Sequence, residues 1–245
     1  MGILSILILC LIAWVLLMAI WWGWVVPKLR RGPTGRAGVG LAWRLSKWLV
    51  RWRHHARVDG VEHLHTLQNG PLIIVANHTG AIDPLLIQAT TDRTIRWMMA
   101  RDLMHPDWTR FWSDIEVIPV DRSGMDAASL RTALRTLRDG GCIGVFPEGR
   151  ITRPPGTIRP FMEGVGLLAG RSGANVLPCW ISGTPDVDGL MASLLGASRS
   201  RVRMLEPARY DKSDTPDKIA ADLRSRIAQA SGWPVVDDMM PLHLG

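Results

Sequence analysis

The sequence predicts an α/β domain whose largely parallel central sheet is flanked by helices and is preceded by an N-terminal membrane helix and an amphipathic interfacial helix. From residue 58 onward, short apolar runs rich in β-branched residues alternate with helical periodicities, an order typical of a parallel sheet covered by helices. A long apolar segment opens the chain, and a tryptophan-rich basic segment follows it. We therefore divide the 245 residues into a membrane-binding part, 1–57, and a folded domain, 58–245.

The opening segment, 3–26, has Ser5 as its one ordinary polar side chain. A membrane-spanning helix needs roughly twenty such apolar residues. Four basic residues follow it closely: Lys28, Arg30, Arg31 and Arg36. Because no basic residue precedes the segment, the positive-inside rule predicts a membrane protein with its domain on the cytoplasmic face. The segment lacks the basic start and small-residue cleavage site of a signal peptide, whereas insertion into one leaflet would give a similar pattern.

Residues 41–55 have the pattern of a second membrane-associated helix. At 3.6 residues per turn, one face is apolar: Leu41, Leu45, Trp48, Leu49 and Trp52. The other face is basic: Arg44, Lys47, Arg51 and His54. Tryptophan opposite a basic stripe suits a helix lying in the headgroup layer of a bilayer. The position of the segment favours this interpretation over an ordinary surface helix packed on the core.

Five apolar runs predict the strands of the sheet: 71–76, 94–100, 115–120, 142–146 and 175–181. The helices of the domain are expected at 83–89, 126–139, 161–171 and from 215 onward. Asp83 is expected to cap the first of these, with Pro84 at its first helical position. Gly140 and the glycine after it end the second. Strands and helices therefore alternate through most of the domain.

His78 and Asp83 follow the first of these strands, in Asn-His-Thr-Gly-Ala-Ile-Asp-Pro. The carboxyl edge of a parallel sheet is where α/β proteins usually place ligands. At that edge Asp83 can hydrogen-bond one ring nitrogen of His78 and leave the other free to take a proton from a hydroxyl. A bare His-x4-Asp is common by chance, so the alternative is a helix cap beside an ordinary loop histidine. The rest of the sequence decides between the two.

Three further blocks end or interrupt later strands: 114–122, 146–150 and 176–181. In their order and spacing, together with the block around His78, they resemble the four sequence blocks of the lysophospholipid acyltransferases. This is the family of glycerol-phosphate and 1-acylglycerol-3-phosphate acyltransferases. The resemblance runs from about residue 58 to about residue 185, and the combination is specific although each block alone is weak.

The resemblance implies an O-acyltransferase of phospholipid biosynthesis. It would transfer a fatty acyl group from an acyl thioester to the free hydroxyl of a lysophospholipid, most directly 1-acylglycerol-3-phosphate to give phosphatidate. His78 would be the general base and Asp83 its orienting group. The residues implied for acceptor binding are Glu148, Gly149, Arg150, Arg122 and Arg101. The donor would be acyl-CoA or acyl carrier protein, with no cofactor and no metal.

The residues themselves leave alternatives open at the acceptor site. Arginines bind phosphate strongly, yet an arginine in a basic chain is usually solvated surface charge, and Glu148 could simply pair with Arg150. The third block reads Glu-Gly-Arg-Ile-Thr where many members of the family have Glu-Gly-Thr-Arg. Met162 stands where many relatives carry lysine. Both departures concern the acceptor, which could also be glycerol-3-phosphate, another lysophospholipid or a lyso-aminolipid.

Composition narrows the partners of the protein. The net charge of +7 fits nucleic acid, anionic lipid or an acidic carrier protein; next to a membrane anchor we expect lipid phosphate and no nucleic acid. His54, His55, His63 and His65 are expected to be solvated rather than metal ligands. A non-catalytic, membrane-tethered lipid-binding protein is the second functional class, and it would not need the oriented base that His78 and Asp83 predict.

Overall fold

The computed structural model describes residues 2–121 and 126–237. In this part of the chain one sheet of eight strands has the order β1-β7-β6-β2-β5-β3-β4, with β8 paired to β6. The strands are β1 (Arg57–Asp59), β2 (Leu72–Ala76), β3 (Ile95–Ala100), β4 (Ile118–Val120), β5 (Cys142–Val145), β6 (Asn175–Ser182), β7 (Arg201–Met204) and β8 (Ala208–Arg209). The β6–β7 and β6–β8 pairs are antiparallel and the other pairs are parallel. The predicted largely parallel sheet is confirmed.

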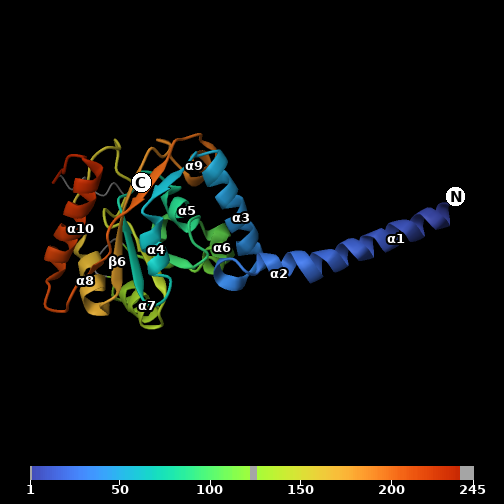
Figure 1. Cartoon of the computed structure of the whole chain (residues 1–245), viewed down its shortest axis with the longest axis horizontal. Coiled ribbons are helices and arrows are strands. Elements are labelled where there is room, and N and C mark those ends of the chain that lie inside the picture. Colours follow the sequence, from blue (N-terminus) through green and yellow to red (C-terminus); the bar gives the residue numbers. More distant parts are fainter. Residues whose placement is uncertain (1, 122–125, 238–245) are drawn as a thin grey trace.

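Helices cover both faces of this sheet (Figure 1). Those of the domain are α4 (Val61–Thr66), α5 (Asp83–Gln88), α6 (Thr109–Asp114), α7 (Ala127–Arg138), α8 (Glu163–Ser172), α9 (Leu190–Leu195) and α10 (Pro216–Ser231). Short 3-10 turns lie at η2 (Pro33–Gly35), η3 (Arg101–Leu103) and η4 (Pro106–Trp108). The expected helices at 83–89, 126–139, 161–171 and the C-terminal end are therefore all present.

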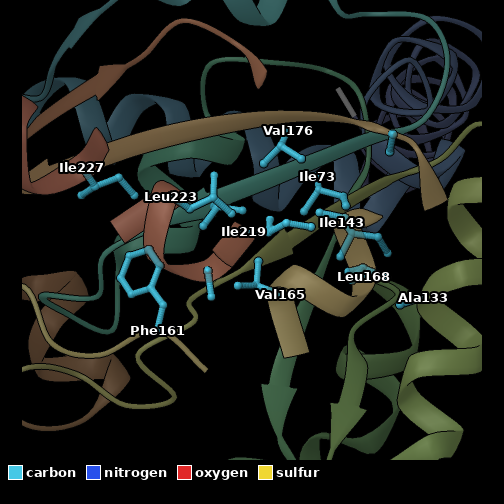
Figure 2. Packing of buried hydrophobic residues seen from close by; sticks show 14 of the residues in the cluster. Ile73, Ala133, Ile143, Phe161, Val165, Leu168, Val176, Ile219, Leu223 and Ile227 are labelled. Carbon is cyan, nitrogen blue, oxygen red and sulfur yellow. The ribbon is translucent and has the colours of Figure 1, made fainter. Parts of the chain in front are cut away.

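The strand β2 is buried on both faces and divides two hydrophobic cores. Ile73 and Val75 face the core under α7, α8 and α10, where strand and helix side chains meet (Figure 2). Ile74 and its alternate neighbours face a second core with α3 (Ala37–Trp52), α4 and α5. Fully burying such a side chain contributes about 1.5–3 kcal/mol. Because its side chains are fixed in both cores, β2 is a rigid support for the loop that follows it in the sequence.

The N-terminal segment is one helical run from Ile3 to Leu29 that projects away from the domain (Figure 1). It comprises α1 (Ile3–Ile20), the π-helical turn η1 (Trp21–Val25) and α2 (Val26–Leu29). No residue of α1 or η1 is buried. At 1.5 Å per residue, 27 residues extend about 40 Å, against a hydrocarbon core of about 30 Å. The run is therefore long and apolar enough to cross a membrane.

The helix α3 exposes the apolar face that the sequence predicted. Leu45, Trp48 and Trp52 are each about 60% exposed. The helix packs on the domain by a third face, where the Trp43 indole N–H donates to the carbonyl of Gln88 at 3.2 Å. This arrangement leaves an apolar surface uncovered by the rest of the described chain.

The expectation that His54 is solvated is wrong. Its side chain follows α3 on the packed face and is fully buried. One ring nitrogen is 2.9 Å from the Ser198 hydroxyl, and the other is 3.1 Å from the carbonyl of Leu194 in α9. Burial lowers the pKa of His54. The residue therefore connects the end of α3 to α9.

The predicted strand over 115–120 is shorter in the structure. The helix α6 continues to Asp114, and Glu116 has a φ of +58°, which no β-strand allows. Pairing begins only at Ile118. The strands β1, β7 and β8 were not predicted, since strands of two to four residues that carry arginines lack the apolar run of a long buried strand.

Candidate functional site

Asn77 fixes the direction in which the chain leaves β2. Its side-chain amide donates to the carbonyl of Ile181 at 2.9 Å, and its amide oxygen accepts the Ile181 backbone N–H at 2.8 Å. Both partners lie in β6, the parallel neighbour of β2. This pair therefore holds His78, the next residue, at the carboxyl edge of the sheet.

His78 and Asp83 are in direct contact, as the sequence predicted. The His78 Nδ1 atom is 2.9 Å from Asp83 Oδ2, and the Asp83 side chain is completely buried while that of His78 is 18% exposed. The same oxygen accepts the backbone N–H groups of Thr79 at 2.6 Å and Gly80 at 3.0 Å. The two backbone N–H groups show that Asp83 Oδ2 acts as a hydrogen-bond acceptor. We therefore assign the ring proton of His78 to Nδ1, which donates to this oxygen, and Nε2 is left able to accept a proton.

The expected capping role of Asp83 is wrong. The helix α5 begins at Asp83, its N-cap position is Ile82, and no side chain caps it by a hydrogen bond. The carboxylate turns back toward His78 instead, because that loop presents it with two backbone donors and the imidazole. The geometry therefore supports an oriented base and not a helix cap beside an ordinary loop histidine.

A chain of hydroxyl groups supports the carboxylate. The Thr79 hydroxyl donates to Asp83 Oδ1 at 3.4 Å, and the Thr184 hydroxyl donates to that of Thr79 at 3.0 Å. Gly80 leaves room for this contact, since a Cβ there would lie 2.8 Å from the Thr184 hydroxyl oxygen. The sequence reasoning missed Thr79 and Thr184, although Thr79 directly follows the candidate base.

Aromatic rings fix the plane of the imidazole. The Phe146 ring stacks on that of His78 with centroids 4.1 Å apart and an interplanar angle of 16°. Trp97 also stacks on Phe146, with ring centroids 5.0 Å apart, in space that Gly144 leaves open. The stack therefore limits rotation of the His78 ring about its own side-chain bonds. Phe146 belonged to a predicted block, but its role did not follow from the sequence.

Glu148 lies beside His78 with its carboxylate turned inward. The residue is 7% exposed. One oxygen accepts the backbone N–H of His78 at 3.0 Å, and the other accepts the Thr152 hydroxyl and the backbone N–H of Arg159 at 3.4 Å. Burial raises the pKa of Glu148, and these hydrogen bonds counteract part of that rise. Hydrogen bonds within the protein therefore hold Glu148 beside His78.

Gly149, Arg150 and Arg101 follow β5 and β3 at the same edge of the sheet, because β2, β5 and β3 are parallel neighbours. Gly149 occupies a turn with φ +71°, where a Cβ would lie 2.9 Å from the Met162 sulfur. Arg150 follows and is half-buried. Arg101 begins the exposed turn η3 after β3. Arg122 would follow β4 and lies outside the described residues.

Among residues 2–121 and 126–237, no group of three or more histidine, cysteine or acidic side chains could hold a metal ion. Cys142 and Cys179 are buried in the core. Burial raises the pKa of the Cys142 thiol to about 12. Neither thiol is therefore suited to act as a nucleophile.

Comparison with known proteins finds similarity to acyltransferases. An acyltransferase family model matches residues 55–182. Curated 1-acyl-sn-glycerol-3-phosphate acyltransferases from Bacillus subtilis and Borreliella burgdorferi are 26% and 28% identical over 113 and 144 residues, or 45% and 58% of this chain. An N-acylphosphatidylethanolamine synthase from Arabidopsis thaliana is 27% identical over 113 residues, 42% of this chain and 40% of its own. The aligned regions span 55% and 56% of the two bacterial relatives, little more than half of their length.

A solved structure shares the fold. The crystal structure of a 1-acyl-sn-glycerophosphate acyltransferase from Thermotoga maritima matches with a TM-score of 0.64 over 80% of each chain, at 20% sequence identity. The arrangement of sheet and helices is therefore common to both chains.

Proposed function

The chain belongs to the acyltransferase family, and on that premise we propose that it transfers a fatty acyl group from an acyl thioester to the free hydroxyl of a lysophospholipid. The acceptor we propose is 1-acylglycerol-3-phosphate, with phosphatidate as the product. Two curated relatives carry that activity in their names. The observation that carries the proposal is the His78–Asp83 pair, because a lipid-binding module has no need of a base oriented by a buried carboxylate.

In the proposed reaction, His78 Nε2 takes the proton of the acceptor hydroxyl as its oxygen attacks the thioester carbonyl carbon. The carbon–sulfur bond then breaks, and the sulfur leaves as a thiolate that receives the proton back from Nε2. The products are the ester and the free thiol of the carrier. Asp83 keeps the Nδ1 proton in place and stabilises the imidazolium between the two transfers.

For the phosphate of the acceptor we propose Arg150, with Arg101 and Arg122 as further ligands. The parallel order of β2, β5, β3 and β4 supports this set, since each of these residues follows a strand that ends at the edge where His78 lies. Guanidinium groups match phosphate oxygens in charge and geometry. Gly149 lets the chain turn between Glu148 and Arg150.

We further propose that the reaction takes place at a membrane surface, with the domain in the cytoplasm and acyl-CoA or acyl carrier protein as the donor. The helical run Ile3–Leu29 and the exposed apolar face of α3 support a membrane location. The basic residues after the first helix support the cytoplasmic orientation.

The test is an acceptor and donor panel, with full-length protein reconstituted in phosphatidylcholine vesicles and mass spectrometry of the lipid products. We expect lysophosphatidate to be acylated faster than glycerol-3-phosphate or lysophosphatidylethanolamine. An amide product from an ethanolamine lipid would favour the activity named for the Arabidopsis relative. No acylated product from any acceptor, with either donor, would refute the proposed function.

Substitutions assign the roles within this assay. His78→Ala should lower kcat by about 10²–10⁴-fold, as expected for loss of a general base, while His65→Ala on the exposed surface of α4 should not. Arg150→Ala should raise the KM of phosphorylated acceptors, and the exposed Arg171→Ala is its control. An equal rise with a phosphate-free acceptor would contradict a phosphate-binding role for Arg150.

A further inference from the structure

We propose that Glu148 and Thr152 are positioning residues that hold the peptide groups of His78, and that Glu148 does not bind the acceptor. This inference rests on the proposed function, in which His78 is the base. Glu148 accepts the His78 backbone N–H at 3.0 Å, and the Thr152 backbone N–H donates to the His78 carbonyl at 2.8 Å. The Thr152 hydroxyl in turn donates to Glu148. We call this closed set of contacts the His78 clamp.

The inward direction of the Glu148 carboxylate argues against a role as a ligand. Glu148 is 7% exposed and Thr152 2%. The Glu148 oxygens already accept three donors from the protein: His78 N–H, the Thr152 hydroxyl and Arg159 N–H. A carboxylate would also repel the phosphate of a glycerol-phosphate acceptor. The position of Glu148 next to the site is therefore explained by the base and not by the substrate.

The clamp holds the main chain of His78, whereas the other contacts of this residue hold its ring. Asp83 fixes the ring nitrogen and Phe146 fixes the ring plane. Phe146 lies two residues before Glu148, so the turn after β5 supplies both the stacked ring and the clamp. Proton transfer needs Nε2 within hydrogen-bond reach of the acceptor hydroxyl. A displacement of the base by about 1 Å can lower a rate about 10²-fold.

Steady-state kinetics on the vesicle-bound, full-length protein separates positioning from binding. Thr152→Val has nearly the shape of threonine and keeps the backbone N–H, but it removes the hydroxyl that orients Glu148. We expect kcat to fall about 10- to 100-fold while the KM of lysophosphatidate changes less than about threefold, and Thr152→Ser to restore kcat. Glu148→Gln should likewise lower kcat and spare KM. The matched control is Thr136→Val, which removes a buried hydroxyl at the opposite edge of the sheet.

The opposite kinetic pattern would overturn the inference. If Glu148 binds the acceptor, Glu148→Gln will raise the KM of lysophosphatidate and leave kcat near that of the unmodified protein. A Thr152→Val variant with unchanged kcat, or one that Thr152→Ser fails to rescue, also contradicts the clamp.

Hydrogen–deuterium exchange tests the clamp without any activity. In Glu148→Ala the backbone amide of His78 loses its acceptor, so this amide, measured in peptides that cover residues 77–80, should exchange at least about tenfold faster. Unchanged exchange there would refute the clamp. If exchange rises but no acceptor is acylated by the unmodified protein, the proposed function fails while the contacts stand.

Discussion

Replacing Asp83 with asparagine isolates the charge of the carboxylate from its geometry. An asparagine oxygen at the Oδ2 position can accept the same three donors, from His78 Nδ1 and the backbones of Thr79 and Gly80. The amide nitrogen would then face the Thr79 hydroxyl, which can turn to accept from it. The fold and the position of the ring should therefore persist, and only the negative charge is lost.

The expected loss of kcat follows from the short distance between the Asp83 carboxylate and the His78 ring. Two unit charges about 4 Å apart attract by about 4 kcal/mol at an effective dielectric constant near 20, and the complete burial of Asp83 limits screening by salt. The imidazolium that forms when His78 takes the proton loses this stabilisation. At about 1.4 kcal/mol per factor of ten, kcat should fall by roughly 10²–10³-fold.

The assay is the release of free thiol from acyl-CoA at saturating lysophosphatidate, with urea unfolding of the same variant as a check on stability. We expect a low kcat, an acceptor KM within about threefold, and a free energy of unfolding within about 1 kcal/mol of the unmodified protein. If Asp83→Asn retains more than about a third of kcat, the carboxylate does not stabilise the base and the argument from charge is wrong.

Three further outcomes are expected elsewhere in the molecule. Leu86→Ala, at a fully buried position in α5, should lower the free energy of unfolding by about 2–5 kcal/mol in urea titrations; a loss below 1 kcal/mol would show that the core repacks. Because burial lowers the pKa of His54, the folded protein binds fewer protons than the unfolded chain. The melting temperature should therefore fall as the pH drops below about 6.5, and it should fall less in His54→Asn. Equal pH dependence in the two proteins would exclude His54 as the cause. An environment-sensitive dye on Trp48→Cys, in a Cys10→Ala background, should shift to the blue on reconstitution in vesicles, whereas the same dye on Arg51→Cys should not; a dye on Trp48→Cys that stays in water would contradict an interfacial α3.

The sequence was sufficient to predict the parts of the fold that depend on periodicity. Apolar runs predicted β2, β5 and β6, and helical spacing predicted α7 and α10, because burial on both faces or on one stripe leaves a local pattern. The short strands β1 and β7 left no such pattern, since β1 pairs with β7, which lies more than 140 residues further along the chain.

In the candidate site, too, contacts between residues close in sequence could be predicted, and contacts between distant residues could not. His78 and Asp83 were recognisable because they lie only five positions apart in the sequence. The inward direction of Glu148 was not, because its partner His78 lies 70 residues away and reaches it only when β2 and β5 pair. His54 was assigned to the wrong environment for a similar reason, since its two partners lie 140 and 144 residues away.

The proposed attachment to a membrane through the projecting helix Ile3–Leu29 has a kinetic consequence. A catalyst held at a bilayer by such a helix meets its lipid acceptor by lateral diffusion within the same surface. Its velocity should then follow the mole fraction of lysolipid among the other lipids and not the amount per volume of buffer. Adding inert phosphatidylcholine at constant bulk lysolipid should slow the reaction by surface dilution, although every chemical group of the site is unchanged.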